Sequence, residues 1–197
     1  MFFRTVAIVG LALAFALGTV GVSAQDKPPN PKAVIETSLG TITVELFKDK
    51  APATVVNFLT YAKDGFYEGT IFHRVIRGFM IQGGGFDEKL ELKTQGLRGA
   101  ILNEATNNER NRRGTVAMAR LPDPNSARAQ FFINTEDNAA LDHKNRTTEG
   151  FGYCVFGRVI DGMDVVEKIE RVRTTRAGDM DDVPREPVII KAIRQLS

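Results

Sequence analysis

Residue types that often mark chemical function are scarce in this chain of 197 residues, which has no tryptophan, one cysteine and two histidines. The single cysteine, Cys154, cannot form a disulfide within the chain. Its apolar neighbours, Val155 and Phe156, predict a small core residue rather than a nucleophile. The two histidines, His73 and His143, stand far apart in the sequence. A histidine-rich metal site is therefore not expected.

An excess of one charge sign is also absent. The chain has 26 Lys and Arg against 24 Asp and Glu, a net charge of +2. Nucleic-acid-binding proteins usually carry a basic patch or stripe, so this balance argues against nucleic acid as a partner. The one basic cluster, Arg110, Arg112 and Arg113, is interleaved with Asn and Glu and is typical of a solvated loop.

A long apolar run occurs only at the N-terminus. Residues 1–4 are short and basic, residues 6–20 are nearly all apolar, and Val22-Ser23-Ala24 is similar to a signal-peptidase site. Residues 1–24 therefore predict a signal peptide, although about 20 apolar residues could also form a membrane anchor. Residues 25–32 contain three prolines and predict a linker. Residues 33–197 are long enough for one domain with a sizeable core.

Short strands bounded by turn residues make up most of that domain. The predicted strands are residues 33–37, 41–46, 72–77, 79–82, 114–119, 130–134, 153–160 and 187–193. In the second of these, Ile42, Val44 and Leu46 are expected to face inward. Residues 87–111 are polar and weakly patterned and predict long loops, which tend to be functional in compact domains.

Two helices are expected among these strands. The first runs from Pro52 to Gly65, and the second from Gly162 to Val172. The predicted buried faces are Val55, Phe58, Leu59 and Ala62 in the first helix, and Val165, Val166 and Ile169 in the second. The chain has no alternating strand–helix rhythm, so a mainly β antiparallel barrel capped by helices fits best.

Residues 72–85 form the most unusual stretch of the chain. Phe72, Arg74 and Ile76 share one parity of a predicted strand, and Gly78 then breaks the run. A chain that folds back there would bring Arg74, Phe79, Met80 and Gln82 around one patch. If Arg74 is buried there, it needs an acceptor, because an unpaired buried charge is costly. A substrate carbonyl or amide would supply one.

These residues carry a resemblance to a known family. The run Phe72-His73-Arg74-Val75-Ile76-Arg77-Gly78-Phe79-Met80-Ile81-Gln82-Gly83-Gly84 resembles the signature of cyclophilin-type peptidyl-prolyl cis-trans isomerases. Residues 114–120, 129–133 and 155–159 match further family blocks in the same order, and the resemblance covers roughly residues 33–196. Residues 80–86 and 151–153 are most similar to the exported bacterial branch. The resemblance implies an eight-stranded antiparallel closed barrel capped by two α-helices, and catalysed rotation about X-Pro bonds without a metal or cofactor.

The resemblance also implies a site. Arg74 matches the catalytic arginine of the family. The substrate-binding positions that it implies are Phe79, Met80, Gln82, Ala119, Arg120, Gln130, Phe132, Leu141 and Tyr153. Arg120 replaces an Asn found in many members, and Tyr153 replaces a pocket His. Ala140 stands where many eukaryotic members have Trp, so the sequence predicts weak cyclosporin binding.

Three functions remain open at this point. The first is an exported, periplasmic isomerase that assists the folding of exported proteins, because uncatalysed X-Pro isomerisation takes tens to hundreds of seconds. The second is a module or chaperone that binds proline peptides, with incidental isomerase activity. The third is a structural partner in an envelope assembly, tethered by residues 25–32. Arg74 and Gln82 favour the first, because simple binding needs only an apolar pocket. We expect a monomer whose partners are proline-containing polypeptides, with no membrane span once the signal is removed.

Overall fold

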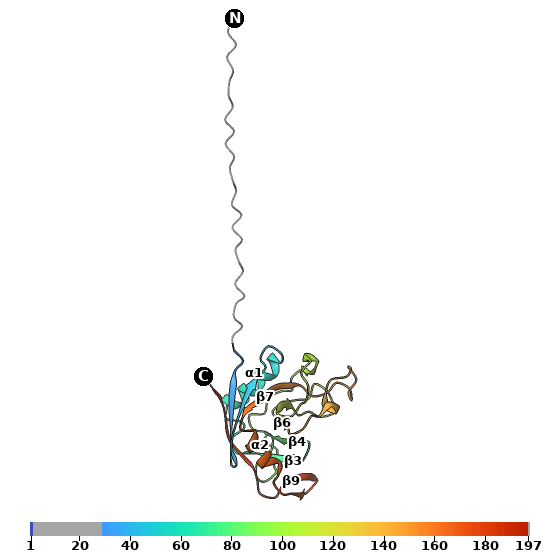
Figure 1. Ribbon diagram of the computed structural model, residues 1–197. Coiled ribbons are helices and arrows are strands. Elements are labelled where there is room, and N and C mark those ends of the chain that lie inside the picture. Colours follow the sequence, from blue (N-terminus) through green and yellow to red (C-terminus); the bar gives the residue numbers. More distant parts are fainter. Residues whose placement is uncertain (2–28, 197) are drawn as a thin grey trace.

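The computed structural model describes residue 1 and residues 29–196. The predicted signal peptide, residues 1–24, lies outside the described residues apart from Met1, as do residues 25–28 of the predicted linker. The described chain forms one body, in which the strands curve around a closed barrel (Figure 1). None of the helices in this part of the chain is long and apolar enough to span a bilayer.

The barrel is closed by antiparallel strands in the order β1-β10-β3-β4-β6-β5-β7-β2. The strands are β1 (Lys32–Thr37), β2 (Gly40–Leu46), β3 (Thr70–Ile76), β4 (Met80–Gly83), β5 (Thr115–Met118), β6 (Phe131–Asn134), β7 (Val155–Asp161) and β10 (Ile189–Leu196). Closure leaves no unpaired sheet edge. The predicted mainly β, eight-stranded antiparallel barrel is therefore confirmed.

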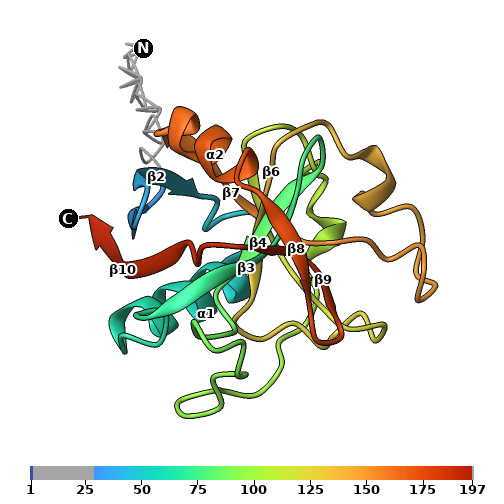
Figure 2. The ribbon, with the colours of Figure 1, turned by 90° about the horizontal axis from the view of Figure 1, so that it is seen from below.

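Two α-helices, α1 (Pro52–Lys63) and α2 (Met163–Glu170), pack on either side of the barrel (Figure 2). Both were predicted, and the predicted inward residues of α2 are buried. The predicted buried face of α1 is partly wrong, since Leu59 and Ala62 are only half-buried. The buried stripe instead includes Thr54, Asn57 and Tyr61. These polar groups can be buried because each finds a partner, such as the Arg128 carbonyl oxygen, 2.6 Å from the Asn57 amide nitrogen.

The barrel interior is filled by alternate side chains from each strand, including Ile42, Val44 and Leu46, as predicted. Phe58 of α1 is fully buried in this core. Its ring centroid lies 5.5 Å from that of Phe131 and 5.2 Å from that of Phe156. These aromatic contacts join the helix to two strands that also build the candidate site.

A second small sheet was not predicted. Strands β8 (Thr174–Ala177) and β9 (Met180–Pro184) pair as an antiparallel hairpin in a stretch for which no strand was predicted. Gly178, at the turn, has a φ of 58°. Most residues of the hairpin are exposed or half-buried, so the apolar alternation that identifies a strand is missing.

The alternation predicted for Phe72 and Arg74 is broken by a bulge in β3. The pairing of β3 with β4 shifts register between these two residues. Phe72 is fully buried in the barrel core, whereas Arg74 is exposed. One extra residue in β3 moves the side chains after it to the opposite face of the sheet from the one that strict alternation predicts. Bulges often have this effect next to functional sites.

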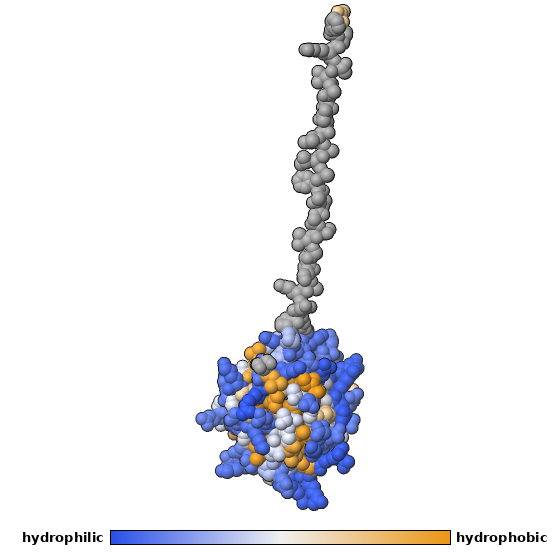
Figure 3. All heavy atoms as spheres, turned by 60° about the vertical axis from the view of Figure 1, so that its left-hand side comes forward, coloured by the Kyte–Doolittle hydropathy of each residue, from blue (hydrophilic) through white to orange (hydrophobic). Residues whose placement is uncertain are grey.

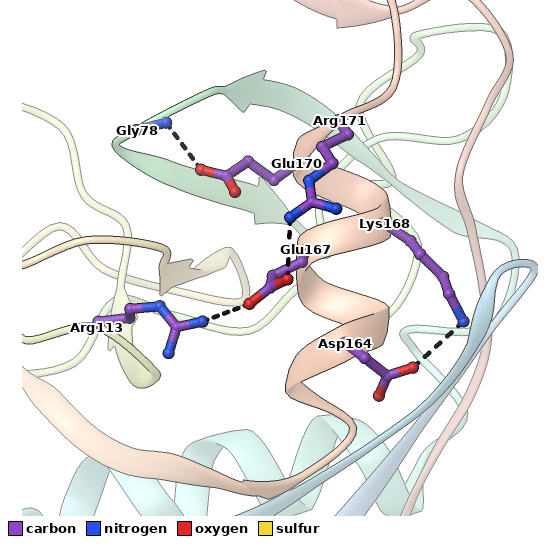
Figure 4. Close-up of polar contacts among 7 residues, drawn as sticks. All are labelled: Gly78, Arg113, Asp164, Glu167, Lys168, Glu170 and Arg171. Atoms are coloured by element: carbon purple, nitrogen blue, oxygen red, sulfur yellow. Dashed lines mark hydrogen bonds and ion pairs between the residues drawn. The ribbon is translucent and has the colours of Figure 1, made fainter.

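Helix α2 also holds the turn between β3 and β4. The Glu170 carboxylate accepts a hydrogen bond of 2.8 Å from the Gly78 amide (Figure 4). On the same helix, Glu167 pairs with Arg113 at 2.5 Å and with Arg171 at 3.1 Å (Figure 4). Exposed ion pairs contribute little stability, so the main consequence of these contacts is that they tie loops to the helix.

Candidate active site

A continuous row of side chains crosses the outer face of five strands. Arg74 of β3 stands opposite Gln82 of β4, and Gln82 stands opposite Phe132 of β6. Phe132 in turn pairs with Ala117 of β5, which pairs with Val155 of β7. Opposed residues in antiparallel strands project from the same face. The barrel thus places a cation, an amide and an apolar floor in one line.

The apolar part of this row belongs to a hydrophobic cluster separate from the barrel core. Its buried members are Met80, Ala117, Phe132 and Val155. Its half-buried members are Phe47, Ile76, Phe79, Ala119, Leu141 and Tyr153. The cluster therefore contains every apolar or aromatic site residue implied by the sequence resemblance. Half-buried rings around a buried floor can hold a small apolar ring such as that of proline.

The two predicted polar residues contact each other directly. The Gln82 side-chain nitrogen donates to the Gln130 side-chain oxygen at 2.9 Å. This bond leaves the Gln82 carbonyl oxygen and the Gln130 amino group to serve a peptide. Gly85 makes the arrangement possible, because a Cβ at that position would lie 2.4 Å from Cγ of Gln130. The glycine run therefore serves close packing rather than an open, flexible backbone.

Arg74 is exposed, so the case considered from the sequence, a buried arginine that needs an acceptor, does not arise. Within residues 29–196 its guanidinium makes neither a hydrogen bond nor an ion pair. No desolvation cost has to be offset, since the charge stays in contact with water. The guanidinium remains available to a ligand lying on the row.

Arg120 closes the opposite side of the cluster. Its guanidinium donates to the carbonyl oxygens of Gly152 at 3.0 Å, Pro122 at 2.9 Å, Leu121 at 3.0 Å and Thr148 at 3.2 Å. It also lies 4.7 Å from the centroid of the Tyr153 ring. Arg120 therefore fixes two loops and one pocket ring, which explains why a long cation is tolerated at this position.

Tyr153 packs edge-on against Phe132, with ring centroids 5.7 Å apart. Its backbone amide donates to the Leu141 carbonyl oxygen at 2.9 Å. Leu141 ends the short 3-10 helix η2 (Ala139–Leu141). Both alanines of η2 are exposed, so no large side chain covers the surface at Ala140.

His73 and Cys154 both lie apart from this site. His73 is 6 % exposed, and its ring lies 4.6 Å from that of Phe86. Burial, aided by the charge of Arg74, lowers the pKa of His73 to about 4. Cys154 is buried as predicted, and burial raises the pKa of its thiol to about 12. A thiol in that state is a poor nucleophile.

Several members of the cluster were missed by the sequence reasoning. Ala117 and Val155 lie two residues from the predicted Ala119 and Tyr153, so strict strand alternation was a signal that could have found them. Ile76 is two residues from Arg74 and shares the outer face with it, so strand alternation could have identified Ile76 as well. Phe47 follows β2, far away in the sequence, and only the closure of the barrel brings it to the cluster.

No other feature of the described residues competes as a catalytic centre. A groove of about 1160 Å³ lies between α1 and the ends of β1 and β10. It shares no residue with the cluster or the row.

One face of the molecule shows apolar patches within a mostly hydrophilic surface (Figure 3). Among the described residues, no group of three His, Cys, Asp or Glu side chains is placed to hold a metal ion.

Comparison with known proteins agrees with this geometry. The family described as "Cyclophilin type peptidyl-prolyl cis-trans isomerase/CLD" matches residues 32–195. The chain is 54 % identical over 157 residues to peptidyl-prolyl cis-trans isomerase B of Escherichia coli, covering 80 % of this chain and 94 % of that protein. It is 52 % identical over 162 residues to a Streptomyces antibioticus peptidyl-prolyl cis-trans isomerase, covering 82 % and 96 %.

Solved structures show the same fold. A Cryptosporidium parvum cyclophilin-type isomerase, crystallised in the presence of the dipeptide Ala-Pro, superposes with a TM-score of 0.69 at 28 % identity. The match covers 84 % of this chain and 99 % of that one. With the family match, the bacterial relatives and the barrel all in agreement, this chain belongs to the cyclophilin-type peptidyl-prolyl cis-trans isomerases and is an enzyme of that activity.

Proposed function

We propose that this isomerase acts on exported proteins, with Arg74 as its catalytic residue and the outer apolar cluster as its proline pocket. The observation that carries the proposal is the row in which Arg74, Gln82 and Phe132 stand opposite one another on three adjacent strands. It joins a free cation, an amide and a floor for the proline ring. A module that only binds proline peptides would need the floor alone.

The chemistry follows from the peptide bond itself. Rotation about it faces a barrier of ~18–20 kcal/mol, because the resonance of the amide must be broken. No bond is made or broken, so the reaction needs no nucleophile. In the twisted state the proline nitrogen regains its lone pair and becomes a better hydrogen-bond acceptor. A group that donates to that nitrogen stabilises the twisted state more than either planar state, which is the requirement for catalysis.

Arg74 suits this task because a guanidinium stays charged and presents several donors in a fixed fork. Phe79, Met80, Phe132 and Leu141 would grip the proline ring while the chain on its other side rotates. The Gln82 carbonyl oxygen and the Gln130 amino group would hold the neighbouring peptide group. Lowering the barrier by about 5 kcal/mol would give nearly four powers of ten in rate. One charge-assisted bond together with positioning is of that order.

Export is supported by the sequence of residues 1–24, which has a basic start, an apolar run and a small-residue site. An exported isomerase would meet chains that fold after crossing the membrane, where X-Pro isomerisation limits the rate. It would work as a monomer in the periplasm, without a cofactor.

Two measurements test this proposal together. The full chain is expressed in a Gram-negative host, and the mass of the product is read in periplasmic and membrane fractions. We expect a periplasmic product that begins at Gln25; an uncleaved, membrane-bound product would contradict the signal peptide. That product should accelerate the proline-limited refolding phase of a test protein.

Two arginine variants test whether the isomerase activity depends on Arg74. Arg74→Ala should remove most of the acceleration, whereas Arg77→Ala should retain it. Arg77 is another exposed arginine, three residues away in the same stretch of chain, but it lies outside the row. Equal loss in both variants would mean that general positive charge, rather than the row, matters.

A further inference from the structure

The walls of the pocket come from loops rather than from the barrel strands. Phe79 lies in the turn between β3 and β4, Leu141 ends η2, and Tyr153 precedes β7. Loops are generally more mobile than the strands they connect. A pocket built in this way needs something that fixes its walls relative to one another.

Three asparagines bridge these loops. The Asn138 side-chain nitrogen donates to the Phe79 carbonyl oxygen at 2.8 Å and to the Asn134 side-chain oxygen at 2.7 Å. Asn134 donates in turn to the Asn111 side-chain oxygen at 3.2 Å. Asn111 donates to the Leu141 carbonyl oxygen at 3.1 Å. An unbroken chain of amides therefore runs from Phe79 to Leu141, two half-buried members of the outer cluster.

The middle of this chain is buried, and each of its amides is hydrogen-bonded through both its oxygen and its nitrogen. Asn134 is 0 % and Asn111 is 1 % exposed. Asn134 accepts from Asn138 and donates to both Asn111 and the Thr115 hydroxyl, 2.9 Å away. A buried amide with all of its partners in place holds one orientation, because breaking any bond leaves an unsatisfied polar group.

Further bonds lock the ends of the chain. The Asn138 backbone amide donates to the Asn111 carbonyl oxygen at 2.7 Å, and the Asn111 amide donates to the Asp142 carboxylate at 2.7 Å. The Leu141 amide donates to the Asn138 carbonyl oxygen at 2.9 Å. Both ends of the amide chain terminate on backbone atoms of pocket residues. If the asparagines served stability alone, nothing would require their outer partners to be pocket walls.

We propose that Asn138, Asn134 and Asn111 are positioning residues that set the distance between Phe79 and Leu141 across the proline pocket. This inference rests on the proposed site. The asparagines touch no substrate themselves; they act through the two apolar walls. The walls grip the proline ring in the planar and in the twisted states alike, so loosening them should weaken substrate binding more than it slows rotation.

The test uses Asn138→Ala in the mature chain and measures initial rates of cis-to-trans conversion of a short Ala-Pro peptide over a range of concentrations. We expect KM to rise about fivefold to tenfold while kcat changes less than twofold. Asn138→Asp keeps the shape but loses both donors, and it should raise KM at least as much. Thermal unfolding of each variant checks that it folds.

Thr37→Val is the matched control. Thr37 is buried, whereas Asn138 is half-buried, and the Thr37 hydroxyl makes two backbone contacts, to the Gly40 carbonyl oxygen at 2.7 Å and from the Leu39 amide at 3.1 Å. It lies in the β1–β2 hairpin, outside the pocket. We expect this variant to lose stability with KM unchanged. A KM that is the same in Asn138→Ala and the wild type would overturn the positioning role, whereas full activity of Arg74→Ala would overturn the proposed site itself.

Discussion

Gln82 and Gln130, 48 residues apart in sequence, are joined by a single hydrogen bond of 2.9 Å between their side chains. Each amide thereby holds the other in place beside the outer apolar cluster. Their contributions to catalysis should therefore not be independent, because removing either one releases its partner.

A double-mutant cycle measures this coupling. Gln82→Ala and Gln130→Ala should each lower kcat/KM by roughly tenfold, about the value of one hydrogen bond to substrate. The double variant should lose clearly less than the product of the two single losses. Multiplicative losses would show that the two amides act separately, contrary to this prediction.

The stability of α1 should depend on a residue from a distant loop. Glu104 accepts hydrogen bonds from the Ala53 amide at 3.1 Å and from the Thr54 amide at 2.8 Å, at the start of a helix that has no side-chain cap of its own. A carboxylate there satisfies free donors and complements the helix dipole. Glu104→Ala should lower the free energy of unfolding by about 1–2 kcal/mol in urea titrations. Glu88→Ala, at an exposed loop position, should leave it unchanged within about 0.5 kcal/mol.

Stability should fall in mild acid because of His73. The pKa of His73 is lowered to about 4 in the folded chain, mainly by burial, from 6.5 for a free side chain. In the unfolded chain His73 becomes protonated below pH 6.5, whereas in the folded chain it becomes protonated only near pH 4. Between these two pH values the unfolded chain therefore binds more protons than the folded chain. The stability present above pH 6.5 is lost as the pH falls through this window, by up to about 3 kcal/mol.

The variant His73→Phe isolates this effect, since its ring can still pack against Phe86. Its free energy of unfolding, measured from pH 7 to pH 4, should decline less steeply than that of the wild type. If both proteins decline in parallel, other groups are responsible for the acid sensitivity.

Cyclosporin should inhibit this enzyme weakly. Many eukaryotic family members carry Trp where this chain has Ala140, and Ala140 is exposed with no aromatic ring in its place. Ala140→Trp should lower the inhibition constant by at least about tenfold, the scale of one aromatic contact. A nanomolar constant for the wild type would refute this prediction.

The sequence predicted the parts of the fold that have a regular period. Ile42, Val44 and Leu46 face inward as alternation requires, and Val165, Val166 and Ile169 face the barrel as the helical period requires. The hairpin of β8 and β9 was missed because its faces are both largely solvated. The bulge at residues 72–74 was missed because the amino-acid sequence does not show where one extra residue enters a strand. The bulge is nevertheless the reason why Phe72 faces inward and Arg74 faces outward.

The site was identified mainly by family resemblance, and the physical reasons for its geometry appear only in three dimensions. Nothing in the sequence links Asn138 to Phe79 or Glu104 to Thr54, because these contacts depend on how loops cross. The opposite faces of Phe72 and Arg74 likewise follow from the bulge in β3. Contacts made by loops carry no periodic signal.

The most direct test of the central claim separates rotation from binding at Arg74. Wild type and Arg74→Ala are compared for kcat in the isomerisation of a short Ala-Pro peptide and, independently, for the Kd of that peptide. A guanidinium that acts on the twisted state predicts that kcat falls by at least ~10²-fold while Kd changes less than about threefold. A large rise in Kd with kcat nearly unchanged would contradict the account, because Arg74 would then hold the peptide rather than assist its rotation.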